Sequence, residues 1–156
     1  PYTPSTNLLY GLNEALDMLL DEGMPQVLAR HQRWAAGVRA AVEAWGLEIQ
    51  CQDPTLYSPV LTGVVMPEGV DADAVRKIIY ERFDLSLGMG LGKAKGKMFR
   101  IGHLGDCNDL TLIATLGGCE AGMKMAGVSL RGSGVLAALD YFAAHPLQAS
   151  SDHQAR

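Results

Sequence analysis

The sequence predicts an α+β domain in which a small sheet has helices packed on one face. Long segments near both ends place apolar residues three or four positions apart, as amphipathic helices do. The middle of the chain instead contains short β-rich runs separated by glycine and proline. The 156 residues are 48% apolar and 19% charged, which is enough apolar material for one buried core.

Two helices come first. A helix over residues 4–20 has a broad stripe of leucines, and Thr3 and Pro4 suit its N-cap and first helical position. A second helix over residues 25–45 ends at Gly46, a residue typical of helix C-termini. In this second helix we expect Leu28, Ala35, Val38, Val42 and Trp45 to point inward, and Arg30, Arg33 and Arg39 to point largely outward.

The remaining elements alternate between strands and helices. Asp71 is the predicted N-cap of a third helix that carries apolar residues up to Phe83, and Asn108 or Asp109 begins a fourth. Strands are predicted over residues 47–51, 60–66, 85–87 and 98–102, a glycine-rich loop over 89–96, and the last two helices over 108–125 and 132–144. We therefore expect a bridging helix (residues 1–22), a small domain (23–145) and a flexible tail (146–156).

Composition excludes several classes of function. The net charge of −4 gives no general attraction to nucleic acid, and no apolar run is long enough to cross a membrane. The N-terminal residues lack the features of a signal peptide, and Cys51, Cys107 and Cys119 show no CxxC spacing, which favours reduced thiols in the cytoplasm. His103 and Cys107 have no second pair of ligands nearby, so no metal site is predicted.

Arg100 is the principal candidate for binding. It lies inside an apolar strand, where a guanidinium is costly unless it is paired, and no acidic residue is local to it. Gly102 and Gly105 would let a ligand approach the backbone. A planar guanidinium is well suited to hold a carboxylate through two hydrogen bonds. The alternative is a structural salt bridge to a remote aspartate or glutamate.

Other candidates have two interpretations each. The Thr3 hydroxyl, at a helix N-terminus, could contact a phosphate or simply cap the helix, and Tyr2 could add a donor. His103 could act as an acid or base, or could be bonded to the backbone. The alternating residues Lys93, Lys95 and Lys97 could attract anions, but are more typical of a solvated surface. No nucleophile and base occur in a known catalytic spacing, so no catalytic residue is assigned.

Three stretches together resemble one enzyme family. They are Tyr2-Thr3-Pro4-Ser5-Thr6-Asn7-Leu8-Leu9-Tyr10-Gly11-Leu12, then Gly88-Met89-Gly90-Leu91-Gly92-Lys93, then Phe99-Arg100-Ile101-Gly102-His103-Leu104-Gly105. In order and spacing they resemble the C-terminal small domain of the class V pyridoxal-phosphate aminotransferases, in the alanine–glyoxylate and serine–glyoxylate aminotransferase family. The likeness runs from Tyr2 to about Met125.

The resemblance implies roles for particular residues. Arg100 would bind the substrate carboxylate, and Thr3, with Tyr2 beside it, would reach the phosphate of pyridoxal 5'-phosphate in a homodimer. In the family the lysine that forms a Schiff base lies upstream of the segment matching Thr3, and none of the five lysines matches it. We therefore expect a fragment or separately encoded small domain that lacks the cofactor-binding large domain and is inactive alone. The amino donor, serine or alanine, stays open.

Two alternatives remain at this point. Another class V member, such as a cysteine desulfurase or a phosphoserine aminotransferase, is one, although Cys107 lacks a desulfurase-like surrounding motif. The other is a non-catalytic α+β module that binds a small carboxylate or dimerises.

Overall fold

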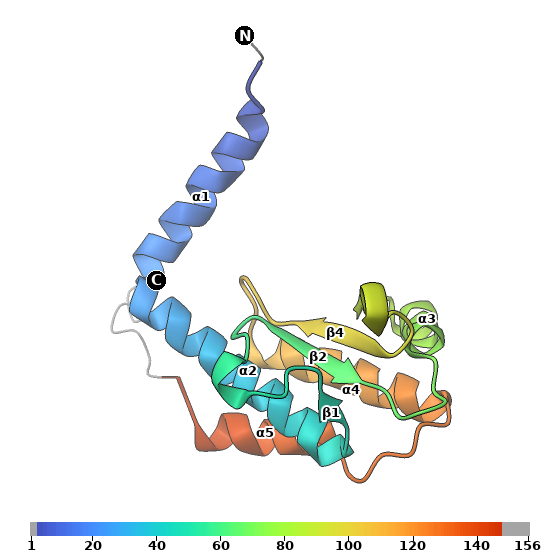
Figure 1. The fold of residues 1–156 in the computed structure, drawn as a ribbon. Coiled ribbons are helices and arrows are strands. Elements are labelled where there is room, and N and C mark those ends of the chain that lie inside the picture. Colours follow the sequence, from blue (N-terminus) through green and yellow to red (C-terminus); the bar gives the residue numbers. More distant parts are fainter. Residues whose placement is uncertain (1–2, 148–156) are drawn as a thin grey trace. The chain divides into compact units, whose positions relative to one another are not determined.

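The computed structural model describes residues 3–147, in which five α-helices and four strands follow one another along the chain (Figure 1). The chain divides into two compact units, one containing residues 3–30 and one formed by His31–Pro146. Each is described by itself below. The expected boundary at residue 22 stays a prediction, and the tail after Leu147 lies outside the described residues.

The first unit contains helix α1 (Thr6–Glu22) and the start of helix α2 (Met24–Trp45). The prediction that Thr3 caps the first helix is wrong. Ser5 is the N-cap, and its backbone is not helical (φ −76°, ψ 79°), so the helix cannot extend back to Pro4. Gly23 ends α1 with a positive φ of 88°. No residue of α1 is buried, and Leu28 of α2, expected inward, is 55% exposed.

The second unit contains a four-stranded antiparallel sheet in the order β1-β2-β4-β3. Its strands are β1 (Glu48–Ile49), β2 (Leu61–Val65), β3 (Gly88–Met89) and β4 (Met98–Gly102). Short 3-10 turns occur at Pro54–Leu56 and Gly92–Ala94. The strand predicted over residues 85–87 is wrong, because two nitrogens of Arg76 take the Leu87 carbonyl that a strand would use, at 2.9 and 2.6 Å. Pairing begins at Gly88.

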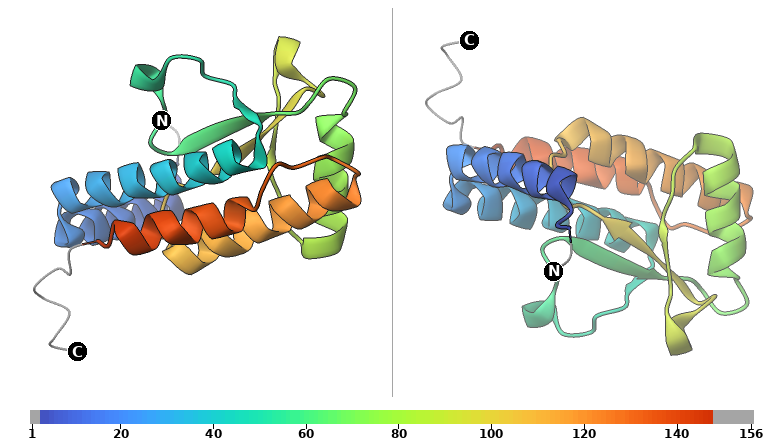
Figure 2. Two further views of the ribbon diagram at one scale, coloured as in Figure 1. Left: turned by 90° about the horizontal axis from the view of Figure 1, so that it is seen from below. Right: turned by 90° about the horizontal axis from the view of Figure 1, so that it is seen from above.

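Three further helices complete this unit: α3 (Ala72–Phe83), α4 (Asp109–Met125) and α5 (Gly134–Ala144). Their starts follow the sequence signals, because the side chains of Asp71 and Asn108 accept hydrogen bonds from the first turns of α3 and α4. In Figure 2, α2, α4 and α5 lie side by side on one face of the sheet, as predicted, while α3 lies at its end. No described helix is long and apolar enough to cross a membrane.

The core lies between the sheet and these helices. Val64 of β2 and Phe99 and Ile101 of β4 have no exposed surface and share one apolar cluster with α2. The inward positions predicted for the C-terminal part of α2 are confirmed, since Ala35, Val38, Val42 and Trp45 are fully buried. Burial of a side chain of this size stabilises the fold by roughly 1.5–3 kcal/mol.

Arg33 of α2 does not point outward as predicted. Its Nη1 and Nη2 bind the two carboxylate oxygens of Asp109 at 2.6 and 2.8 Å, and Nη2 also donates to the Phe142 carbonyl at 3.0 Å. Trp34 Nε1 donates to the same carboxylate at 3.1 Å. One arginine thus joins the start of α4 and the end of α5 to α2. The acid is 76 residues away in sequence, which explains why no local pattern revealed the pair.

Candidate functional site

Arg100 lies on the face of the sheet opposite to the helices. Side chains alternate along a strand, and its neighbours Phe99 and Ile101 are buried in the core, so Arg100 points to the other face. Its cross-strand partners are both glycine, Gly63 on β2 and Gly88 on β3. A Cβ at Gly88 would lie 3.0 Å from Arg100 Nε. The missing side chain at Gly88 therefore leaves room in which the Arg100 side chain can lie across β3.

The charge of Arg100 has no acidic partner among residues 3–147. None of the ion pairs of these residues involves Arg100, and its Nε is buried without a hydrogen-bond partner. The described residues therefore do not form the structural salt bridge that the sequence left open as the alternative for Arg100. A buried donor left without a partner costs roughly 1–3 kcal/mol. An anion from outside these residues would relieve that cost.

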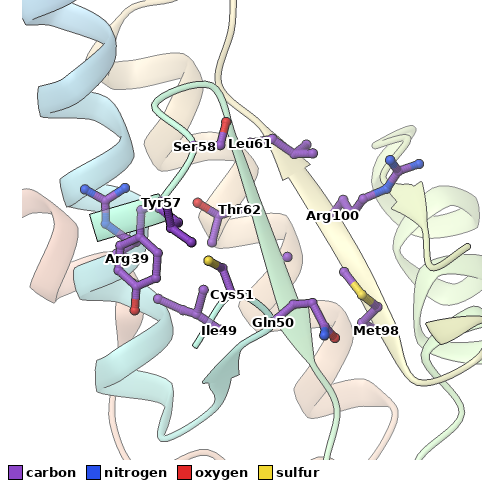
Figure 3. A pocket seen from close by; sticks show the side chains of 12 residues that line it. Arg39, Ile49, Gln50, Cys51, Tyr57, Ser58, Leu61, Thr62, Met98 and Arg100 are labelled. Atoms are coloured by element: carbon purple, nitrogen blue, oxygen red, sulfur yellow. The ribbon is translucent and has the colours of Figure 1, made fainter. Parts of the chain in front are cut away.

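A cavity of about 290 Å³ lies beside this strand. Its walls come from α2, the end of β1, the segment 50–58, β2 and β4, and Arg100 forms one end. Figure 3 shows that the Arg100 guanidinium points away from this cavity, toward β3. Arg39, expected to point into solvent, is half-buried and lies at the opposite end. The two arginines therefore line opposite ends of the cavity, and the guanidinium of Arg100 points out of it.

His103 is fully buried and is bonded to the backbone, as one of the two sequence interpretations held. Its Nδ1 donates to the Pro59 carbonyl at 3.0 Å, since a carbonyl can only accept. Its Nε2 therefore accepts from the Thr62 hydroxyl, also at 3.0 Å. Burial is the main reason that the pKa of His103 falls to about 4. The neutral ring ties β4 to the segment before β2 and has no free nitrogen for acid–base chemistry.

The remaining sequence candidates lie apart from this arrangement. Thr3 is exposed and belongs to the first unit, and Tyr2 lies outside the described residues. The lysines at 93, 95 and 97 are exposed, as the interpretation of a solvated surface predicted. Among the described residues no three potential ligands could hold a metal ion, and the three cysteines form no disulfide. Burial raises the pKa of the Cys119 thiol to about 12.

Arg39 and the pair Gly63 and Gly88 were not identified from sequence as parts of a site. The flanking glycines expected for Arg100 were Gly102 and Gly105, its neighbours along the chain. The glycines that face Arg100 come instead from β2 and β3. Which residues face each other depends on strand register, and register is set by pairing between segments distant in sequence. Gly88 did fall in a stretch that carried the family resemblance, but nothing local in that stretch indicated which residue it faces.

No family model matches the sequence. The chain is 48% identical over 143 residues to the serine–glyoxylate aminotransferase of Hyphomicrobium methylovorum, an alignment covering 91% of this chain and 35% of that protein. It is 45% identical over 146 residues to that of Arabidopsis thaliana, covering 93% and 36%. The solved pyridoxamine–pyruvate aminotransferase of Mesorhizobium loti matches with a TM-score of 0.86 and 38% identity, over 92% of this chain and 37% of that one.

These matches confirm the resemblance to the class V aminotransferases of the alanine–glyoxylate and serine–glyoxylate family. It spans about a third of the length of the curated relatives that it matches. The crystal structure of ureidoglycine–glyoxylate aminotransferase from Bacillus subtilis agrees in fold, with a TM-score of 0.84 and 30% identity over 91% of this chain. The predicted fold, a small sheet with helices on one face, is confirmed by these matches and by the sheet itself.

The family implies a pyridoxal-phosphate cofactor, and the lysines of this chain do not fit its covalent attachment. All five lysines are exposed. Lys77 and Lys124 are paired with Glu81 and Glu120, and the other three lie in or beside the exposed glycine-rich loop. A lysine that forms a Schiff base needs a site that shields the cofactor from water and orients it. None of these five lysines lines the 290 Å³ cavity.

Proposed function

We propose that this chain is the C-terminal portion of a pyridoxal-phosphate-dependent serine or alanine–glyoxylate aminotransferase, and that it does not transaminate alone. In this proposal its Arg100 binds the α-carboxylate of the amino acid and of glyoxylate. The observation that carries it is the Arg100 side chain, whose buried Nε has no partner and whose guanidinium lies over Gly88. The names of the relatives, each over about a third of its length, support the choice of substrates.

The contribution of Arg100 would be orientation. A guanidinium fork holds a carboxylate in one plane through two charge-assisted hydrogen bonds. Fixing the carboxylate limits where the α-carbon can lie, and correct placement of a reacting atom accounts for much of an enzyme's rate enhancement. Because Gly88 has no side chain, the guanidinium itself can lie close to the backbone of β3, which fixes where the carboxylate would be held.

One further part of the proposal rests on the family alone. Thr3 would reach the cofactor phosphate, with Tyr2 beside it, in a homodimer. A cytoplasmic location is supported by the absence of disulfides among Cys51, Cys107 and Cys119. The non-catalytic carboxylate-binding module remains the alternative, and it differs from this proposal in needing no cofactor.

The test is a titration of the 156-residue chain with glyoxylate, followed through backbone amide NMR shifts. We expect the largest shifts at Gly63, Gly88 and Arg100, and their loss in Arg100→Met. Arg82→Met, which removes an exposed arginine from the last turn of α3, is the matched control and should bind normally. Equal binding by the folded Arg100→Met variant would refute the carboxylate role.

A second measurement tests the claim that the chain is inactive alone. Pyridoxal phosphate is added, the visible absorption is recorded, and the sample is reduced with borohydride. We expect no stoichiometric attachment to a single lysine. One cofactor fixed per chain at one lysine, with turnover of serine and glyoxylate, would contradict the proposal.

A further inference from the structure

Arg39 is a second arginine without an acidic partner, and it is separate from the proposed substrate site. It is half-buried on α2, and among the described residues it makes no ion pair or side-chain hydrogen bond. Its Cζ lies 5.0 Å from the centre of the Tyr57 ring. Burial lowers the pKa of Arg39, but a guanidinium stays charged at neutral pH. The ring supports one face of the guanidinium and leaves its edge available.

The open edge of β2 explains why a cavity forms beside Arg39. Strand β1 has two residues and β2 has five, so pairing stops where Gln50 N donates to Gly63 O at 2.9 Å. After Gln50 the chain leaves the sheet and makes the 3-10 turn at Pro54–Leu56. The space between this segment and β2 is the 290 Å³ cavity. Figure 3 shows Arg39 and Tyr57 on one side of β2 and Arg100 on the other.

The other walls of this cavity are mainly apolar. Its neutral polar residues include Gln50, Ser58 and Thr62, and the Thr62 hydroxyl already donates its proton to His103. Arg39 is therefore the principal charged donor at its end of the cavity, beside hydrocarbon surface. Small-molecule sites commonly combine an apolar wall with one or two polar groups that fix orientation. The apolar walls near Arg39 come from Ile49 and Leu56, whereas Leu61 and Met98 line the part of the cavity on the Arg100 side of β2.

We propose that Arg39, Ile49 and Leu56 bind a small organic carboxylate with a hydrocarbon body, at a site distinct from that of Arg100. The carboxylate would take two hydrogen bonds from the edge of the guanidinium, while the hydrocarbon part would cover Ile49 and Leu56. The two sites are on opposite faces of the sheet, because Arg100 is on the face away from the helices and α2 packs on the other. A wider groove of about 630 Å³, which also contains Arg131 and Tyr141, adjoins the Arg39 end.

The test uses the 156-residue chain and 4-methylpentanoate as the probe, with 4-methylpentanamide as its uncharged isostere. We expect 4-methylpentanoate to shift the backbone amide resonances of residues 50–58 and 62. We expect 4-methylpentanamide to bind about tenfold more weakly or worse, because a charge-assisted hydrogen bond is lost. Arg39→Met should weaken the binding of 4-methylpentanoate by a similar factor. Arg131→Met, which removes an exposed arginine that does not line the cavity, should change binding less than twofold.

Two results would overturn the proposal: the amide binding as well as the carboxylate, or a folded Arg39→Met variant binding normally. Arg39→Lys keeps the charge, so partial recovery of binding in that variant would support a specific contact. Glyoxylate titrations separate the two sites. Glyoxylate binding should be lost in Arg100→Met and retained in Arg39→Met. If the prediction for Arg39 fails, the proposed function of Arg100 still stands, and if the prediction for Arg100 fails, the Arg39 site still stands.

Discussion

Gly88 lies directly opposite Arg100 in the β3–β4 ladder, and a Cβ on Gly88 would fall 3.0 Å from Arg100 Nε and 3.4 Å from Cζ. The position of the guanidinium thus depends on a missing side chain on the neighbouring strand. The partner on the other side, Gly63, is crowded by Met98 and Gln50 rather than by Arg100. Gly88 is therefore the residue that controls where the arginine can lie.

Replacing Gly88 by valine should move Arg100 without removing its charge. The methyl groups would occupy the space of the guanidinium, so we expect glyoxylate binding to fall by about tenfold, equivalent to one charge-assisted hydrogen bond. An NMR titration measures this change in the affinity for glyoxylate. The control is Gly117→Ala on α4, where a Cβ would meet nothing within 4 Å. Unchanged binding in Gly88→Val would show that the arginine does not need its present position.

Glu120 should make stability depend on pH in acid solution. It is 6% exposed, and burial alone would raise its pKa, but hydrogen bonds from Lys124, Trp45, the Val135 amide and Ser133 outweigh burial and lower it to about 2. The folded state therefore favours the carboxylate. This stabilisation is complete above the ordinary pKa of about 4.5 and is lost as the pH falls toward 2.

Urea unfolding across this range measures the effect. We expect wild type to lose about 2–3 kcal/mol between pH 5 and pH 2, and Glu120→Gln to be less stable at pH 7 with a flatter profile. Glu81→Gln is the control, because its pair with Lys77 is exposed and 3.8 Å long, and such pairs contribute little. A Glu120→Gln variant as stable as wild type at pH 7 would contradict the assignment.

His103 should make the folding stability depend on pH over a different pH range. Its pKa in the folded state, about 4, is below the ordinary value of 6.5, so between these values the unfolded chain binds more protons. The contribution of His103 is complete above pH 6.5 and is lost as the pH falls to 4. We expect a loss of about 2–3 kcal/mol over this interval, and none over it in His103→Gln. Ring resonances of His103 that titrate near 6.5 would contradict the buried, neutral state.

Local signals in the sequence were sufficient for most elements. Asp71 and Asn108 start helices because their side chains accept backbone N–H groups, a property that can be read within four residues. The outward direction of Arg100 follows from strand alternation with Phe99 and Ile101. Thr3 failed as a cap because Ser5, two residues later, is also a residue type that suits an N-cap.

Non-local contacts explain what the sequence did not reveal. Arg33 was assigned to solvent from its position on the helix, but Asp109 and the Phe142 carbonyl bind it from distant segments. The expected strand over 85–87 was displaced because Arg76 binds the Leu87 carbonyl. The glycine opposite Arg100 depends on register, and register depends on three strands pairing. Each case needed a partner that lies 11 or more residues away.

Helix α1 should make the isolated chain self-associate. None of its 17 residues is buried, and Leu9, Leu12 and Leu16 are 56%, 55% and 47% exposed. Contiguous exposed apolar surface of this kind favours association. Sedimentation velocity at increasing concentration should show a mass above that of the monomer. Leu12→Glu should weaken association by about tenfold or more, because burying a leucine contributes roughly 1.5–3 kcal/mol.

The control for this experiment is Asn13→Glu. It adds the same negative charge one position along α1, to a residue whose side chain instead donates to Asp17 at 2.9 Å. If association depends on the leucine stripe, Asn13→Glu should associate nearly as strongly as wild type, whereas a general effect of charge would weaken both variants equally. A wild-type chain that sediments as a monomer at millimolar concentration would show that the exposed leucines do not pair with a second copy.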